Sequence, residues 1–159
     1  RSTLFPYTTL FRSLFICDDI IDNNVIDTDN DGLDDCTDTD DDNDLVADVS
    51  DCVPLDSGAF VAPTELPDDL IVLPSEPTGI TWNLQNFGPA TVYDIATGPI
   101  PGGGFGAGTC LDSVTAPPAL DLRDPPFPGN FYYYLIRARN ACGAATFGNL
   151  ERDQHPGCQ

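Results

Sequence analysis

The aspartates between residues 27 and 51 follow a spacing suited to binding metal ions. They form two units offset by thirteen residues. Numbered from 1 within each unit, positions 1, 3, 5, 9 and 12 are acidic in both; they are Asp27, Asp29, Asp31, Asp35 and Asp38, then Asp40, Asp42, Asp44, Asp48 and Asp51. Carboxylates at positions 1, 3 and 5 point inward as the chain curls. Ca²⁺ takes about six to eight oxygen ligands at about 2.3–2.6 Å, so this spacing predicts a twelve-residue calcium loop.

Two further positions decide whether each loop closes around an ion. Position 7 contributes a backbone carbonyl, here from Leu33 and Val46. Position 6 makes a sharp turn that favours glycine, because a residue without Cβ enters the left-handed region freely. Gly32 occupies this position in the first loop, but Leu45 occupies it in the second and is expected to be strained. The sequence therefore predicts one Ca²⁺ in each loop, with Leu45 deciding the second.

A run of aspartates can also be a solvated, disordered segment, because like charges repel. One register kept through two copies favours the calcium loops instead. The loops, DTDNDGLDDCTD and DTDDDNDLVADVSDC, resemble tandem thrombospondin type 3 repeats over about residues 17–56. That resemblance implies calcium-filled loops without regular secondary structure, tied by disulfides between repeats. EF-hands and dockerins share the loop but need a helix after it, and the second loop begins too soon to leave room for one.

The charge distribution restricts the partners of the chain. The formal net charge is −20, and 16 of the 26 acidic residues lie between Asp18 and Asp56. There is no lysine, and no arginine lies between Arg12 and Arg123. This balance argues against nucleic acid, whose phosphates require a basic face. Two bound Ca²⁺ ions would relieve the repulsion, so folding and metal binding are expected to be coupled.

The cysteines indicate an oxidising compartment. No two of them form a CxxC pair, so they suggest disulfides rather than a zinc site, and about fifteen disulfide pairings are possible. The cysteines are Cys17, Cys36, Cys52, Cys110, Cys142 and Cys158. Disulfides and weak calcium loops are both typical of extracellular proteins, secreted or on the cell surface. No apolar run is long enough to span a membrane.

The composition changes sharply along the chain. Residues 3–13, TLFPYTTLFRS, are similar to a translated sequencing adapter, so residues 1–13 are predicted to be a disordered artefact outside the fold. Residues 14–56 form the calcium-binding segment and 57–67 a linker. From 68 to 159, short β-favouring runs alternate with proline and glycine, which predicts an all-β sandwich; the runs are 70–73, 79–84, 90–96, 105–114, 130–140 and 144–148.

Alternation assigns faces to these expected strands. Ile80, Trp82 and Leu84 share one face of their strand, and Tyr93 and Ile95 share one face of the next. Tyr132, Tyr134, Ile136 and Ala138 share one face of the longest strand. The segments GITWNL, TVYDIATG and YLIRARNACG resemble the second, third and sixth strands of a fibronectin type III domain over about residues 66–149. The resemblance implies that Trp82 lies in the core and that Tyr134 takes the tyrosine-corner place. Such domains recur beside calcium repeats in secreted bacterial proteins.

Residues for catalysis are sparse. His155 is the only histidine and there is no lysine, so we expect no nucleophile–base pair for catalysis. The run GGGFGAG at 102–108 lacks the lysine and following helix of a phosphate loop. Tyr133, Arg137 and Arg139 form the only basic-aromatic group, interpreted as the outer face of a strand or as a surface for a glycan or a neighbouring protein.

The sequence thus predicts a non-enzymatic fragment in which Ca²⁺ stiffens an acidic spacer beside a β-sandwich. The expected role is cell adhesion or surface presentation. Two alternatives stay open: accessory C-terminal modules of a secreted hydrolase, and a sandwich that binds carbohydrate or protein.

Overall fold

The computed structural model describes residues 26–66, 70–100, 108–148 and 158. The predictions for residues 1–13, for His155 and for most of the glycine-rich run lie outside these residues. The chain divides into two compact units, Arg1–Ser57 and Gly58–Gln159. Within the described residues there is no helix, and therefore none that could cross a membrane.

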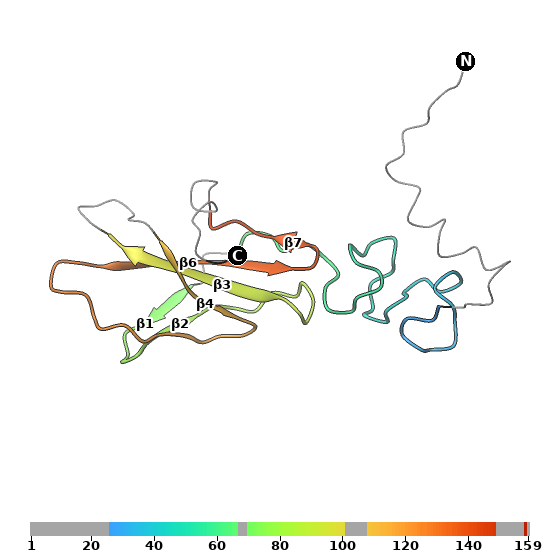
Figure 1. The fold of residues 1–159 in the computed structure, drawn as a ribbon, viewed down its shortest axis with the longest axis horizontal. Helices are drawn as coiled ribbons and strands as arrows, with labels where there is room; N and C mark the ends of the chain where they lie inside the picture. Colours follow the sequence, from blue (N-terminus) through green and yellow to red (C-terminus); the bar gives the residue numbers. More distant parts are fainter. Residues whose placement is uncertain (1–25, 67–69, 101–107, 149–157, 159) are drawn as a thin grey trace, which may run out of the picture. The chain divides into compact units, whose positions relative to one another are not determined.

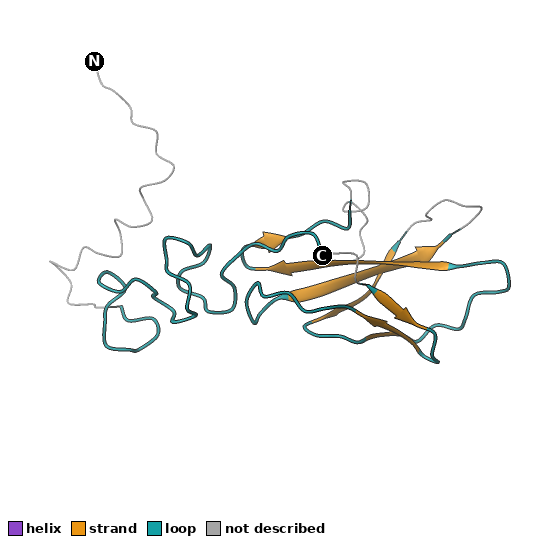
Figure 2. Cartoon of the chain, turned by 180° about the vertical axis from the view of Figure 1, so that it is seen from behind, coloured by secondary structure: helices purple, strands orange, loops and turns teal. Residues whose placement is uncertain are grey.

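In the first unit, the described residues form only turns and bends (Figure 2). Local hydrogen bonds organise them, and the backbone pattern repeats. The N–H of Asp35 donates to the carbonyl of Ile26 at 2.9 Å, and the N–H of Asp48 donates to that of Thr39 at 3.0 Å. These two bonds are related by the thirteen-residue offset of the sequence. The repeat in sequence is therefore also a repeat in backbone conformation.

The second unit consists of two antiparallel sheets (Figure 1), which confirms the predicted all-β class. A three-stranded sheet has the order β1-β2-β5, and a four-stranded sheet has the order β4-β3-β6-β7. The strands are β1 (Ile71–Leu73), β2 (Thr78–Thr81), β3 (Val92–Pro99), β4 (Thr109–Val114), β5 (Ala119–Asp121), β6 (Tyr132–Asn140) and β7 (Gly143–Ala144).

The core lies between the two sheets and follows the predicted alternation for β3 and β6. Tyr93 pairs with Ala138 in register, and Ile95 pairs with Ile136. Trp82 packs on Tyr93 with ring centroids 5.3 Å apart. Burying these aromatic and branched side chains against the opposite sheet is the main favourable term for the fold. The buried cluster comprises Ile80, Trp82, Phe87, Tyr93, Ile95, Ala119 and Ala138.

Two expectations about the strands are wrong. Leu84 was expected to share the buried face of Trp82, but β2 ends at Thr81 and the Leu84 side chain is 57% exposed. Strand alternation no longer applies once the chain has left the sheet. The strand β5 was not predicted, because its three residues follow two prolines and are too short to show a period.

Candidate metal centre

Each acidic loop gathers three carboxylates at one point. Ligand oxygens of Asp27, Asp29 and Asp31 all lie within 4.8 Å of one another. The equivalent group in the second loop, Asp40, Asp42 and Asp44, meets the same limit. The structure thus brings together positions 1, 3 and 5 of both predicted loops.

Backbone N–H groups orient these carboxylates. In the first loop the side chains at positions 1, 3 and 5 accept hydrogen bonds from the N–H groups of positions 6, 5 and 7, at 3.1, 2.9 and 2.8 Å. In the second loop the same three bonds measure 3.1, 3.1 and 2.8 Å. Each carboxylate therefore has one oxygen held by the backbone. The other oxygen is left for a different partner.

Except at the exposed Asp31, the remaining oxygens of these carboxylates are buried without a hydrogen-bond partner. Among the described residues of the two loops, six ligand-position atoms are in this state: Oδ1 of Asp27 and Asp40, and Oδ2 of Asp29, Asp42, Asp44 and Asp51. Burying an unpaired carboxylate oxygen is costly, because it loses water and gains nothing in return. A cation at the centre of each loop would remove that cost.

Positions 9 and 12 have different surroundings. Both Asp35 oxygens accept hydrogen bonds from Thr28, from its N–H and from its hydroxyl, each at 2.9 Å. Position 9 therefore braces the start of the first loop and lies outside the group at positions 1, 3 and 5. At position 12, Oδ1 of Asp51 accepts the N–H of Val53 at 2.7 Å. The Asp51 Oδ2 atom is one of the buried unpaired oxygens.

The carbonyl oxygens expected at position 7 are available as ligands. Within the described part of the chain, no hydrogen bond reaches the carbonyl oxygen of Leu33 or of Val46. Unpaired carbonyls of this kind are suitable calcium ligands.

The turn at position 6 closes in both loops. Gly32 has φ +99°, and Leu45 adopts φ +78° at the equivalent place. The strain predicted at Leu45 is therefore present, and its side chain is 90% exposed, so packing does not offset it. Asparagine, which tolerates this region, takes position 4 in both loops, with φ 62° at Asn30 and 56° at Asn43.

Burial raises carboxyl pKa values in these loops, since it penalises the charged form. The pKa values of Asp29 and Asp42 are raised chiefly by burial. The pKa of Asp41 is raised to about 6, again chiefly by burial and then by the charge of Asp48 and of the neighbouring aspartates. No arginine or lysine lies between residues 27 and 51 to balance these charges.

Asp41 is the one residue of the cluster that the sequence reasoning missed. It is only 8% exposed, and its Oδ1 is buried and unpaired. Its N–H donates to Asp48 at 3.0 Å, as the N–H of Thr28 donates to Asp35 in the first loop. Aligning the loops places Asp41 opposite Thr28, and that comparison would have shown that a carboxyl replaces a hydroxyl there.

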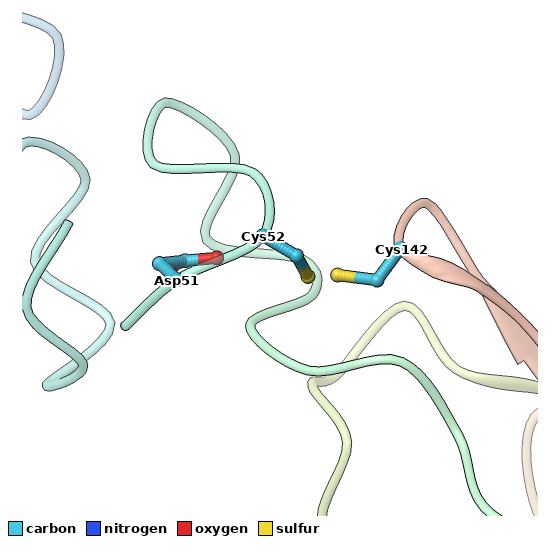
Figure 3. A group of neighbouring side chains, drawn as sticks. All are labelled: Asp51, Cys52 and Cys142. Atoms are coloured by element: carbon cyan, nitrogen blue, oxygen red, sulfur yellow. The ribbon is translucent and has the colours of Figure 1, made fainter. Parts of the chain in front are cut away.

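The cysteines do not compete with the aspartates as ligands. Figure 3 shows Asp51 and Cys52 as neighbours on one loop, and Cys142 on the turn between β6 and β7. Both cysteines are disulfide-bonded, as is Cys36. A disulfide sulfur has no thiolate to offer a metal. The candidate ligands are therefore oxygen atoms, which suits a hard cation such as Ca²⁺.

Two of the three residues of the expected basic-aromatic group are largely withdrawn from solvent. Tyr133 is only 8% exposed, and the Arg137 side chain is 14% exposed. Arg137 and Arg139 both pair with the fully buried Asp94 of β3, with Nε–oxygen distances of 3.3 and 3.0 Å. Their positive charge is used inside the protein. The Arg139 side chain is 38% exposed, so the interpretation of this group as a glycan or protein surface stays a prediction.

The face of the four-stranded sheet that points away from the core is covered by other residues of the same chain. Cys158 is buried there and forms a disulfide with Cys110 of β4. Phe147 is buried too, and its ring lies 4.7 Å from the Arg137 guanidinium carbon. This cover explains why Arg137 and its carboxylate partner are withdrawn from solvent.

Comparisons of the chain with protein-family models, with curated proteins and with solved structures find no match.

Proposed function

We propose that residues 27–51 bind two Ca²⁺ ions and that this binding orders an acidic spacer. The observation that carries the proposal is the set of six buried, unpaired carboxylate oxygens at ligand positions. Two loops with matching hydrogen bonds at a thirteen-residue offset support it, because one geometry is built twice.

The proposed ligands are the carboxylates at positions 1, 3, 5 and 12 and the carbonyl at position 7. Position 9 contributes through a water or braces the loop, as Asp35 does with Thr28. Without cations the loops hold their repelling charges by hydrogen bonds alone, so ion binding stiffens the segment. Micromolar calcium would not fill such sites if they have the affinity of extracellular modules, about 10⁻⁴–10⁻³ M.

The disulfides and the weak calcium loops fit an extracellular protein, secreted or displayed on the cell surface. In such a setting the ordered spacer holds the β-sandwich at a set distance from whatever precedes it. This is the function of an adhesion or surface-presentation module, and the resemblance to thrombospondin type 3 repeats and a fibronectin type III domain supports the same role.

Calorimetric titration of the full chain with CaCl₂ tests the proposal. Two sites are expected, and Asp29→Asn and Asp42→Asn, which occupy equivalent positions, should each remove one. Asp34→Asn is the matched control, because it deletes the same charge from a half-buried residue outside the ligand set. Two sites retained in either ligand variant, or no binding heat in the wild type, would refute the assignment.

A further inference from the structure

A second place in the protein combines a cavity with fixed polar groups and exposed aromatic rings. It lies in the sandwich, beside the end of β5 and the start of β6. We call it the end cleft: a cavity of about 420 Å³ bounded by Val72 and Thr78 of one sheet, Tyr132 and Tyr134 of the other, and Arg123 and Phe131 of the loop between β5 and β6. Its volume is within the range of small-ligand sites, about 300–1,000 Å³.

Hydrogen bonds hold the polar wall of the end cleft in place. Asp121, only 2% exposed, accepts hydrogen bonds from Arg123 Nε at 2.9 and 3.1 Å and from the Tyr134 hydroxyl at 2.8 Å. Arg123 also donates to the Thr97 hydroxyl at 2.9 Å, and its guanidinium lies 4.1 Å from the centroid of the Tyr132 ring. A guanidinium held in this way loses little conformational freedom when a ligand binds.

The apolar wall is exposed. Phe131 is 64% exposed, and Phe127, which lines the adjoining groove with Pro125 and Pro126, is 84% exposed. Large exposed rings beside a cavity are typical of a binding site rather than of chance surface.

Charge decides which class of ligand fits. Residues 58–159 contain ten acidic residues and four arginines, a formal charge of −6, and Arg123 is already neutralised by Asp121. An anionic ligand is therefore repelled. Asp124 lines the cleft and adds a further acceptor. A ligand is needed that has apolar faces for the rings and hydroxyl groups for Arg123 and Asp124.

We propose that the end cleft binds an uncharged saccharide chain. Its C–H faces pack on Phe127 and Phe131, and its hydroxyls accept hydrogen bonds from Arg123 and donate to Asp124. The site lies wholly in the β-sandwich unit and uses none of the calcium ligands.

Affinity electrophoresis of the full chain tests this, because a protein with pI about 4.1 migrates well in native gels. The gels contain β-glucan, xylan or galactomannan as neutral probes, or polygalacturonate as an anionic probe. At least one neutral polymer is expected to retard the wild type. Phe127→Ala and Phe131→Ala should each raise the apparent Kd about five-fold or more. Leu84→Ala is the control, since it removes an exposed apolar side chain outside the cleft.

Retardation should persist in EDTA, so loss of calcium binding and loss of saccharide binding are separable results. Three outcomes overturn the proposal: no retardation by any neutral polymer, retardation only by polygalacturonate, or equal retardation of the wild type and both phenylalanine variants. Binding of a proline-rich peptide that no saccharide displaces would assign the cleft to protein recognition instead and would also overturn it.

Discussion

Replacing Leu45 with glycine should strengthen calcium binding by the second loop. Leu45 holds φ +78° at the turn where the first loop has Gly32 with φ +99°. Its N–H nevertheless donates to Asp40 at 3.1 Å, the same distance as from Gly32 to Asp27. The closed loop therefore has the same geometry with leucine as with glycine. Because we propose that ion binding orders the loop, the backbone strain of a residue with a Cβ opposes binding.

The size of the effect follows from two opposing terms. A residue with a Cβ in the left-handed region costs about 1–2 kcal/mol. Glycine gives back about 0.4–1 kcal/mol, because it makes the unfolded chain more flexible. The Leu45 side chain is 90% exposed, so little packing is lost. The net gain of about 1 kcal/mol corresponds to about a five-fold lower Kd for the second site.

Chelator-competition titration at constant ionic strength measures this change. Val49→Ala is the control, because Val49 is 97% exposed in the same loop and has no positive φ. Gly32→Ala should weaken the first site, since a Cβ there meets no atom within 4 Å and adds only strain. The reasoning fails if Leu45→Gly binds no more tightly than the wild type, or if Val49→Ala tightens binding equally.

Two further predictions concern the sandwich. The hydrogen bonds and charge of Arg123 lower the pKa of Asp121 to about 2. The ionised carboxylate therefore contributes about 2 kcal/mol to the free energy of unfolding above pH about 4, and this contribution is lost as the pH falls towards 2. Urea unfolding across that range should show the loss in the wild type, and Asp121→Asn should abolish it; an unchanged pH dependence in the variant would contradict the assignment. Asp94→Asn should cost about 3 kcal/mol at pH 7, because it leaves Arg137 and Arg139 without their buried carboxylate. Thermal unfolding measures this cost, and a loss no larger than that of the surface variant Leu84→Ala would show that the pairs contribute little.

The clustering of the aspartates was predictable from sequence because the geometry of the acidic loops is local. Each hydrogen bond that orients a carboxylate at positions 1, 3 and 5 joins residues two or five apart. The spacing of aspartates therefore specifies the cluster, and the positive φ at Leu45 follows from its place in the loop. Asp41 was missed because it stands at position 2, outside the ligand spacing, and its burial does not follow from that spacing.

The all-β class and the core positions on β3 and β6 were also readable, because alternation along a long strand has a clear period. The end of β2 before Leu84 and the three-residue strand β5 were not, since neither leaves a periodic signal.

What the sequence determined by itself is therefore the pair of acidic loops, the all-β class and the inward face of the long strands. Only the tertiary structure decided what covers the other face. Asp94 meets Ser113, Arg137 and Arg139, which are 19, 43 and 45 residues away in sequence, and these contacts form an ion-pair network around a buried carboxylate. The end cleft is likewise assembled from four strands and a loop. Contacts between distant segments form only when the strands pair and the sheets pack, so no local spacing of residues predicts them.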